Sequence, residues 1–168
     1  MAELTPKERL QPSLLDRLTD DDPDRRLEAR ERRFLTPMQL RECVRRDLAW
    51  LLNTTHLETT TDLSDYPQVA TSVINFGVVD LAGKPLSSIN TVQLERLVRE
   101  SIWQFEPRLI RESVRVKVDE RKTGHNALAF VIEAQLWAQP LPLQLFLRTE
   151  VDLESGEVKV GDKDASSE

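Results

Sequence analysis

Three consecutive residues, Glu106, Pro107 and Arg108, place two opposite charges on either side of a rigid corner. They follow a segment with helical apolar spacing that ends at Phe105, and they precede an alternating segment that starts at Ser113. Proline lacks a backbone N–H and crowds the preceding turn, so the triplet predicts the end of a helix before a strand. Such a charge pair can hold elements of the fold together, or it can face a partner protein.

The carboxylates of Glu106 and Asp47 are the pair to consider for acid–base chemistry of the kind that hydrolyses glycosides. That reaction needs one carboxyl group with a raised pKa in an apolar pocket and a second group that stays ionised. Arg108, two residues from Glu106, favours the ionised carboxylate and so removes the acid. The sequence therefore predicts no catalytic residue at this corner.

Residues that could bind a metal or act as a nucleophile are few and separated. His56 and His125 lie far apart in polar segments, and Cys43 lies on the flank of a predicted helix. Neither arrangement has the spacing of a metal site or of a Cys/His pair. The chain has only five glycines and no Gly-rich phosphate loop. We therefore expect a protein that is not an enzyme and that binds no cofactor or metal.

The composition indicates one soluble domain. The chain has 168 residues, of which 39% are hydrophobic and 31% charged, and its net charge is −6. The negative charge argues against a nucleic-acid partner. No apolar run approaches the roughly 20 residues that span a bilayer, and the N-terminus lacks a signal-peptide core, so we expect a cytoplasmic protein without direct membrane insertion.

The first predicted helix covers residues 36–52. Thr36 is its expected cap, Pro37 suits the first helical position, and Gln39 completes a capping box. Asp47 falls inside the apolar stripe of this helix. A buried carboxylate needs a partner, for which Arg108 is the candidate, and the alternative is that Asp47 lies at the water-exposed border of the stripe.

A second helix is predicted over 88–105, and the apolar spacing then changes to a period of two. The alternating segments predict strands near 113–118, 128–138, 143–151 and 158–160. This order predicts an α+β fold with N-terminal helices packed on one face of a small antiparallel sheet of three to four strands. We expect residues 1–35 to form a flexible or partner-docking arm, 36–160 the α+β domain, and 161–168 an acidic disordered tail.

Three sets of apolar residues are candidates for binding surfaces. In the arm, Leu14, Leu15 and Leu18 are expected to dock either on their own domain or on a partner. Trp103 and Trp137 lie opposite the main apolar stripes of their elements, as interface anchors or as a second packed layer. The third predicted strand offers an edge that either accepts a strand from a partner or is protected by the acidic tail. The residues of that edge are Leu143, Leu145, Leu147 and Val151.

Four stretches of the chain together resemble one protein family. They are residues 11–21 (QPSLLDRLTDD), 46–54 (RDLAWLLNT), 72–81 (SVINFGVVDL) and 102–109 (IWQFEPRL). In this order they resemble the TssE family of the type VI secretion baseplate, over about residues 10–153. That family is related to the baseplate wedge proteins of contractile phage tails, which have long carried a lysozyme-like label.

The resemblance implies a structural role at a baseplate on the cytoplasmic face of the inner membrane. Expected partners are the wedge proteins TssF, TssG and TssK and the contractile sheath proteins TssB and TssC, whose polymerisation a TssE protein initiates. Glu106 and Arg108 would contact the helical core of the wedge, and Pro107 would fix their geometry. Two alternatives remain: a regulatory binding module of the anti-adaptor type on the same fold, and a peptidoglycan hydrolase.

Overall fold

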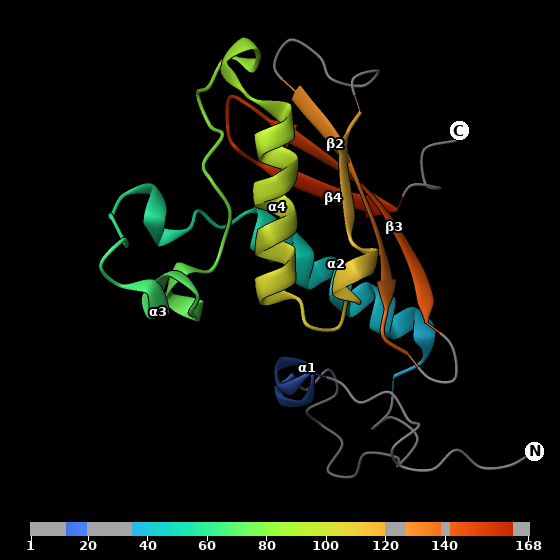
Figure 1. The fold of residues 1–168 in the computed structure, drawn as a ribbon. Helices are drawn as coiled ribbons and strands as arrows, with labels where there is room; N and C mark the ends of the chain where they lie inside the picture. Colours follow the sequence, from blue (N-terminus) through green and yellow to red (C-terminus); the bar gives the residue numbers. More distant parts are fainter. Residues whose placement is uncertain (1–12, 20–34, 120–126, 139–141, 163–168) are drawn as a thin grey trace, which may run out of the picture.

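The computed structural model describes residues 13–19, 35–119, 127–138 and 142–162. Two long helices and four strands make up most of this part of the chain (Figure 1). The helices α2 (Pro37–Leu52) and α4 (Thr91–Phe105) precede the strands β1 (Arg115–Val118), β2 (Ala127–Leu136), β3 (Leu143–Asp152) and β4 (Val158–Asp162). The short helices are α1 (Leu14–Leu18) and α3 (Pro67–Ala70), and the 3₁₀ turns are η2 (Leu57–Thr59), η3 (Val73–Asn75), η4 (Leu86–Ser88) and η5 (Arg111–Ser113).

Both long helices begin at capping side chains. Thr36 Oγ1 accepts the backbone N–H of Gln39 (3.2 Å), and the Gln39 side chain accepts the N–H of Thr36 (2.9 Å), which is the predicted capping box. Asn90, which together with Ser88 was a candidate cap for this helix, accepts the N–H of Gln93 at its Oδ1 (3.0 Å), so α4 begins at Thr91 rather than at 88. The difference arises because residues 86–88 form a separate 3₁₀ turn.

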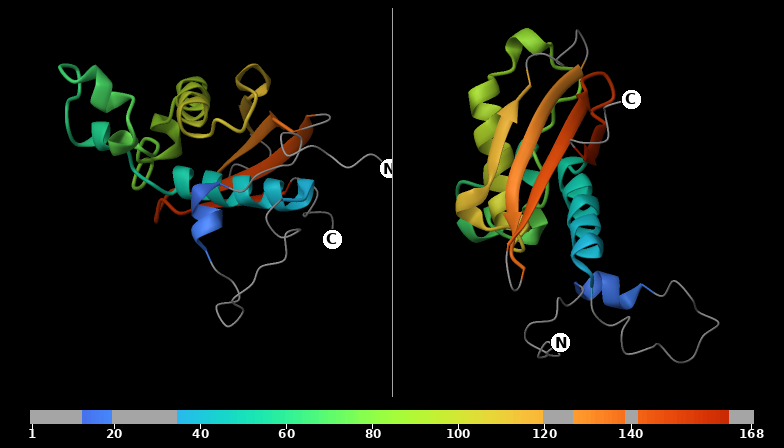
Figure 2. Two further views of the ribbon diagram at one scale, coloured as in Figure 1. Left: turned by 90° about the horizontal axis from the view of Figure 1, so that it is seen from below. Right: turned by 90° about the vertical axis from the view of Figure 1, so that its right-hand side faces the viewer.

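The four strands form one antiparallel sheet in the order β1-β2-β3-β4. α2 and α4 pack on one face of it, and no described helix lies in front of the other face in the right-hand view of Figure 2. The predicted α+β class, with helices on one face of a four-stranded antiparallel sheet, is confirmed. One boundary is wrong: Gly161 and Asp162, placed in the tail, belong to β4. Residues 163–168 lie outside the described part.

The core lies between the two helices and the sheet. Alternate residues of each strand and one stripe of each helix are buried there, which is the pattern that the sequence predicted. Its fully buried members include Val44, Leu48, Ile102, Val114, Leu128, Ile132, Leu136, Leu145 and Leu147. Since α4 ends on this core, the residues that follow it start from a fixed position.

Candidate functional site

The Glu-Pro-Arg triplet forms a closed ion pair at the end of α4. Glu106 caps the helix, its N–H donates to the carbonyl of Ile102 (2.9 Å), and its side chain is only 4% exposed. Arg108 Nε donates to Glu106 Oε1 (2.7 Å) and Arg108 Nη2 to Glu106 Oε2. The guanidinium therefore occupies both carboxylate oxygens, the strongest form of this contact. Pro107, between them, is exposed.

Asp47 extends this pair into a chain of charges. Arg108 Nη2 lies 2.6 Å from Asp47 Oδ2, so the structure brings together the two residues that the sequence analysis paired. Arg46 contacts the other oxygen of Asp47 (2.8 Å) and also Asp16 of α1 (2.7 Å). Charges alternate along Glu106, Arg108, Asp47, Arg46 and Asp16, and they join α4, α2 and α1 in one network.

The ionisation of this network follows from its geometry. Burial lowers the pKa of the Arg108 guanidinium, but the contacts with Glu106 and Asp47 outweigh burial and raise it. Burial likewise raises the pKa of the Asp16 carboxyl, but hydrogen bonds from Ser13 and Arg46 outweigh it and hold the pKa below its usual value. Asp16 and Arg108 are therefore charged at neutral pH.

A groove of about 530 Å³ opens beside the network, between α1, α2 and the end of α4. Its walls are mostly apolar, and the ionic residues form part of its lining. The lining residues are Ser13, Leu15, Asp47, Leu48, Trp50, Leu51, Phe76, Phe105, Glu106, Pro107 and Arg108. A volume of this size takes bulky side chains of a partner, and the polar groups on its wall can orient them.

A close backbone contact places the wall residue Phe76. Its ring packs edge-on against Phe105 at 5.2 Å. The next residue, Gly77, has φ +133°, and a Cβ there would lie 2.3 Å from the carbonyl oxygen of Thr54. Val78 N–H then donates to the same carbonyl (2.8 Å), so only glycine lets the chain run this close to the exit of α2.

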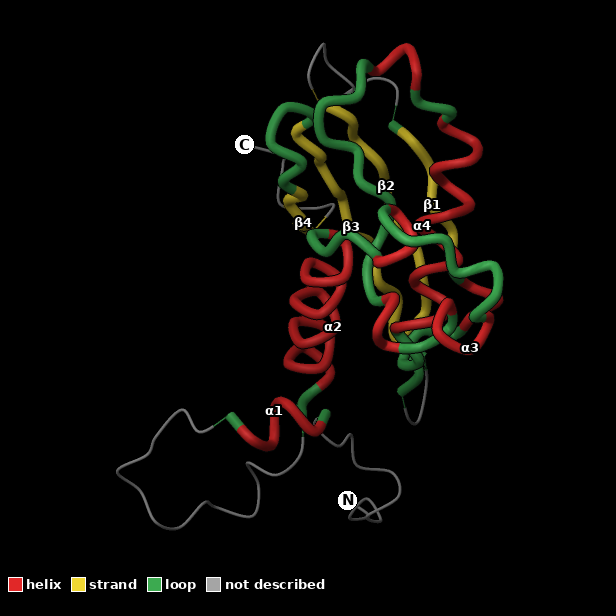
Figure 3. The backbone as a smooth tube through the Cα atoms, turned by 90° about the vertical axis from the view of Figure 1, so that its left-hand side faces the viewer, coloured by secondary structure: helices red, strands yellow, loops and turns green. Residues whose placement is uncertain are grey.

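The predicted arm contacts lie on α1, which is beside α2 and away from the sheet (Figures 1 and 3). α1 is attached through Asp16 and Arg46 rather than through a leucine cluster. Leu14 and Leu18 are 70% and 73% exposed, and the half-exposed Leu15 lines the groove. Their use by a partner stays a prediction, and residues 1–12 and 20–34 of the arm lie outside the described part.

The two candidate tryptophans differ in their surroundings. Trp137 is 59% exposed, and its backbone N–H donates to the carbonyl of Arg108 (2.8 Å), so it lies beside the triplet. Trp103 is half-buried and packs against the core, as in the second-layer alternative. Its indole N–H donates to the carbonyl of Arg111 (2.8 Å).

The predicted strand-accepting edge needs a correction. β3 is an interior strand over its second half, where Leu147 pairs with Asp162 and Val151 with Val158 of β4. β4 pairs antiparallel with this half of β3 as the next strand of the hairpin, so β4 is the outer strand there. β4 ends opposite Leu147. At Gln144, near the start of β3, no described strand pairs with β3 on the side away from β2.

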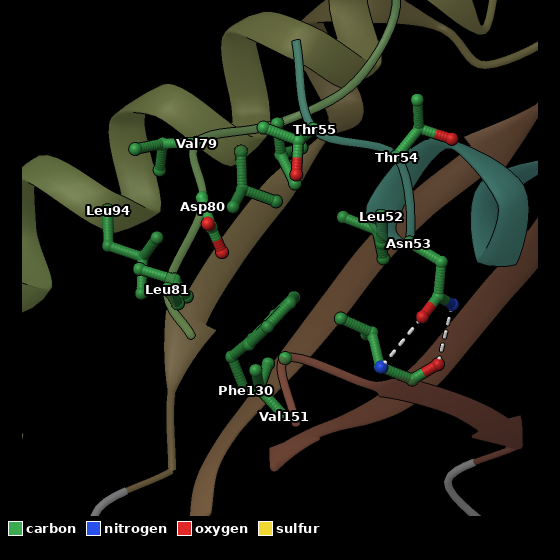
Figure 4. A pocket seen from close by; sticks show the side chains of 14 residues that line it. Leu52, Asn53, Thr54, Thr55, Val79, Asp80, Leu81, Leu94, Phe130 and Val151 are labelled. Carbon is green, nitrogen blue, oxygen red and sulfur yellow. Dashed lines mark hydrogen bonds between the residues drawn. The ribbon is translucent and has the colours of Figure 1, made fainter. Parts of the chain in front are cut away.

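Side chains of α2 and its exit cover the outer edge of β4. Asn53 Nδ2 donates to the carbonyl of Val158 (2.7 Å), and Val158 N–H donates to Asn53 Oδ1 (2.8 Å), as the dashed lines of Figure 4 show. Arg45 Nη1 donates to the carbonyl of Val160 (3.0 Å). These contacts occupy backbone groups that an added strand would need.

The small space in Figure 4, bordered by Asn53, Val79, Leu94 and Phe130, measures about 50 Å³. That is far below the roughly 300–1,000 Å³ of small-molecule sites. Among the described residues, no group of three or more His, Cys, Asp or Glu side chains could hold a metal ion. No helix in the described ranges is long and apolar enough to cross a membrane.

Sequence reasoning missed two of these features. The Asp16–Arg46 contact joins two of the stretches that carry the family resemblance. The one sequence feature that could have indicated it is the single acidic residue in the leucine-rich LLDRL segment. The Asn53–Val158 pairing spans 105 residues, and no local pattern announces it.

Comparison with known proteins defines the class to which this fold and corner belong. Residues 38–141, more than half of the chain, match the family described as baseplate wedge protein gp25. The chain is a member of that baseplate wedge family, of which TssE is the homologue in type VI secretion. Neither the curated proteins nor the solved structures contain a match to the chain.

Proposed function

We propose that this protein is the TssE-type adaptor of a type VI secretion baseplate, working at the cytoplasmic face of the inner membrane. It links the wedge proteins TssF, TssG and TssK to the contractile sheath proteins TssB and TssC and starts sheath polymerisation. Membership of the baseplate wedge family supports the structural role. The pairing of Arg108 with both oxygens of Glu106, the one deeply buried carboxylate in the described part, supports a non-catalytic role.

The observation that carries the wedge-binding proposal is the groove beside the Glu-Pro-Arg corner. It combines apolar walls with an ion network that is already satisfied internally, so a partner helix can bury apolar side chains there without leaving a charge unpaired. Half-exposed Trp50 and exposed Pro107 lie on its border. Tryptophan at the border of such a groove is a frequent anchor of protein interfaces.

The exposed leucines of α1 extend this wedge-binding surface. Leu14 and Leu18 bury little of their surface within the chain, although the helix itself is held by Asp16. Contact with a partner would remove that apolar surface from water. The arm is then part of the wedge-binding face rather than a separate linker.

Wedge binding is tested with two variants, because Arg108 has two roles. Arg108→Ala leaves buried Glu106 without a partner, so we expect a loss of about 3 kcal/mol in the free energy of unfolding together with loss of co-purification with TssF and TssG. Trp50→Ser removes a half-exposed groove residue whose ring Arg46 covers at 4.9 Å, so we expect a loss of only about 1 kcal/mol in the free energy of unfolding and the same loss of co-purification.

The matched control is Arg96→Ala. Arg96 lies on the exposed side of α4 and forms only a loose pair with Glu100 (3.9 Å), so co-purification should be retained. Normal co-purification of Trp50→Ser would show that the groove is not the wedge site, whatever happens to Arg108→Ala.

A further inference from the structure

A second surface, formed by α4 and the 3₁₀ turn η5 away from the groove, holds two arginines over one tryptophan. Trp103 is fixed in place because it packs against the core and donates its indole N–H to the carbonyl of Arg111 (2.8 Å). The guanidinium carbons of Arg99 and Arg111 lie 5.2 Å and 4.8 Å from the centre of its ring. Both distances are those of cation–π contacts.

These two guanidinium groups carry charge that the described residues do not neutralise. Neighbouring cations have acidic partners: Arg96 pairs with Glu100, and Lys117 with Glu95. Within the described part of the chain, no carboxylate forms an ion pair with Arg99 or Arg111, and Arg99 Nε is buried without a hydrogen-bond partner.

Holding two like charges against one ring costs free energy that an anion would offset. The indole limits the motion of both side chains, so little rotamer entropy is lost when a ligand binds. Each guanidinium still has N–H groups in a planar fork that fits a carboxylate. The arrangement is therefore prepared for an anionic ligand.

We infer that Arg99, Trp103 and Arg111 form a docking site for an acidic segment of a protein partner, with one Asp or Glu carboxylate on each guanidinium. A protein segment fits better than nucleic acid. Nucleic-acid binding relies on many phosphate contacts, whereas this site has two cations, nearby Glu100 and Glu112, and a chain with net charge −6. The site is separate from the wedge groove, whose lining contains Phe105 but not Trp103.

The test titrates the full-length chain with hexaglutamate peptide at low ionic strength and follows the indole N–H resonance of Trp103, assigned with Trp103→Phe. We expect saturable binding that moves this resonance. The double variant Arg99→Gln/Arg111→Gln should lose affinity by at least about tenfold, because two charge-assisted contacts disappear. The matched control Arg96→Gln should keep the affinity of the parent chain, since Arg96 already has a partner.

A charge-reversed pair keeps the test decisive even if the glutamine variant folds poorly. Arg99→Glu/Arg111→Glu should bind hexalysine and not hexaglutamate. The inference is overturned if hexaglutamate binds the parent and the double glutamine variant equally, or fails to bind the parent. Tighter binding of a single-stranded hexanucleotide, lost in the same variant, would also overturn it by assigning the site to nucleic acid. Because the isolated chain is used, either result leaves wedge docking untouched.

Discussion

At the scale of single residues, Glu106 shows how a buried charge can specify a corner. A carboxylate that is 4% exposed costs free energy unless it is fully paired, and here Arg108 pairs both of its oxygens. Replacing such a pair by apolar residues often leaves stability unchanged, so its value here is geometric. It fixes Pro107 at the border of the groove.

Thr149 gives a residue-scale prediction about stability. This residue of β3 is fully buried, and its Oγ1 has no hydrogen-bond partner. Thr149→Val replaces the unsatisfied hydroxyl with a methyl group of similar size, so we expect the free energy of unfolding to rise by about 1 kcal/mol. Urea denaturation of the purified chain measures it.

The same substitution at Thr36 is the matched control. Thr36 Oγ1 caps α2, so Thr36→Val should lower the free energy of unfolding by about 1 kcal/mol. A decrease for Thr149→Val would mean that its hydroxyl has a partner in solution.

At the scale of elements, α1 depends on its contact with α2. A five-residue helix is too short to be stable alone, even with its Ser13 capping box. The Asp16–Arg46 pair is the ionic contact that attaches it to the domain. The arm leucines were predicted to dock either on this domain or on a partner, and with the ion pair holding α1, their use by a partner stays a prediction.

This attachment should depend on pH. The pKa of Asp16 is lowered from its ordinary value of 3.8, so the ionised carboxyl favours the docked helix above that pH. The stabilisation is lost as the pH falls from 3.8 through the lower folded pKa, because the protonated group no longer pairs with Arg46. The protection of the amides of residues 14–18 from hydrogen exchange, relative to the intrinsic rate at each pH between 6 and 2.5, measures how far α1 stays docked on α2.

Asp16→Asn is the control for this titration. Without a carboxyl at position 16, α1 should already show little protection from exchange at pH 6 and lose little further protection at low pH. Equal exchange in the parent and variant chains at pH 6 would show that the ion pair does not hold α1.

The sequence predicts most elements because local patterns determine them, and it fails where contacts are distant. Thr36 and Gln39 make the start of α2 readable, and alternation defines all four strands. The interior position of β3 depends on how far β4 extends along it. At the candidate site, the position of Asp47 in the apolar stripe suggested Arg108 as its partner, and the structure pairs the two with Asp47 still 23% exposed, but the groove arises from three separate elements.

At the scale of the whole molecule, the two long helices also protect the edges of the sheet. α2 and its exit occupy the outer backbone groups of β4 through Arg45 and Asn53. α4 does the same for β1, where Val118 N–H donates to Glu95 Oε1 (2.9 Å). Side chains that block edges in this way limit uncontrolled strand pairing. We propose that a strand of the sheath adds at the start of β3, which β4 does not cover.

Gln144 allows a test of this proposal. Along β3, the backbone N–H and C=O groups of successive residues point alternately toward and away from β2. The N–H of Asp152 points away from β2, because it donates to the carbonyl of Glu157 (2.9 Å). Gln144 lies an even number of residues before Asp152, so its N–H points away from β2 as well. Gln144→Pro removes an outward N–H and leaves the β2–β3 ladder intact. We expect normal stability, normal co-purification with TssF and TssG, and loss of sheath assembly by TssB and TssC, counted by fluorescence microscopy of tagged sheaths.

Leu145→Pro is the informative comparison, because the backbone of Leu145 faces β2 and its side chain is fully buried. This variant should unfold and lose both partners, so a selective defect in Gln144→Pro cannot come from general damage to the sheet. Normal sheath frequency in Gln144→Pro would contradict strand addition at this edge. The next surface to test for the sheath contact would be the uncovered face of the sheet, which has no described helix above it.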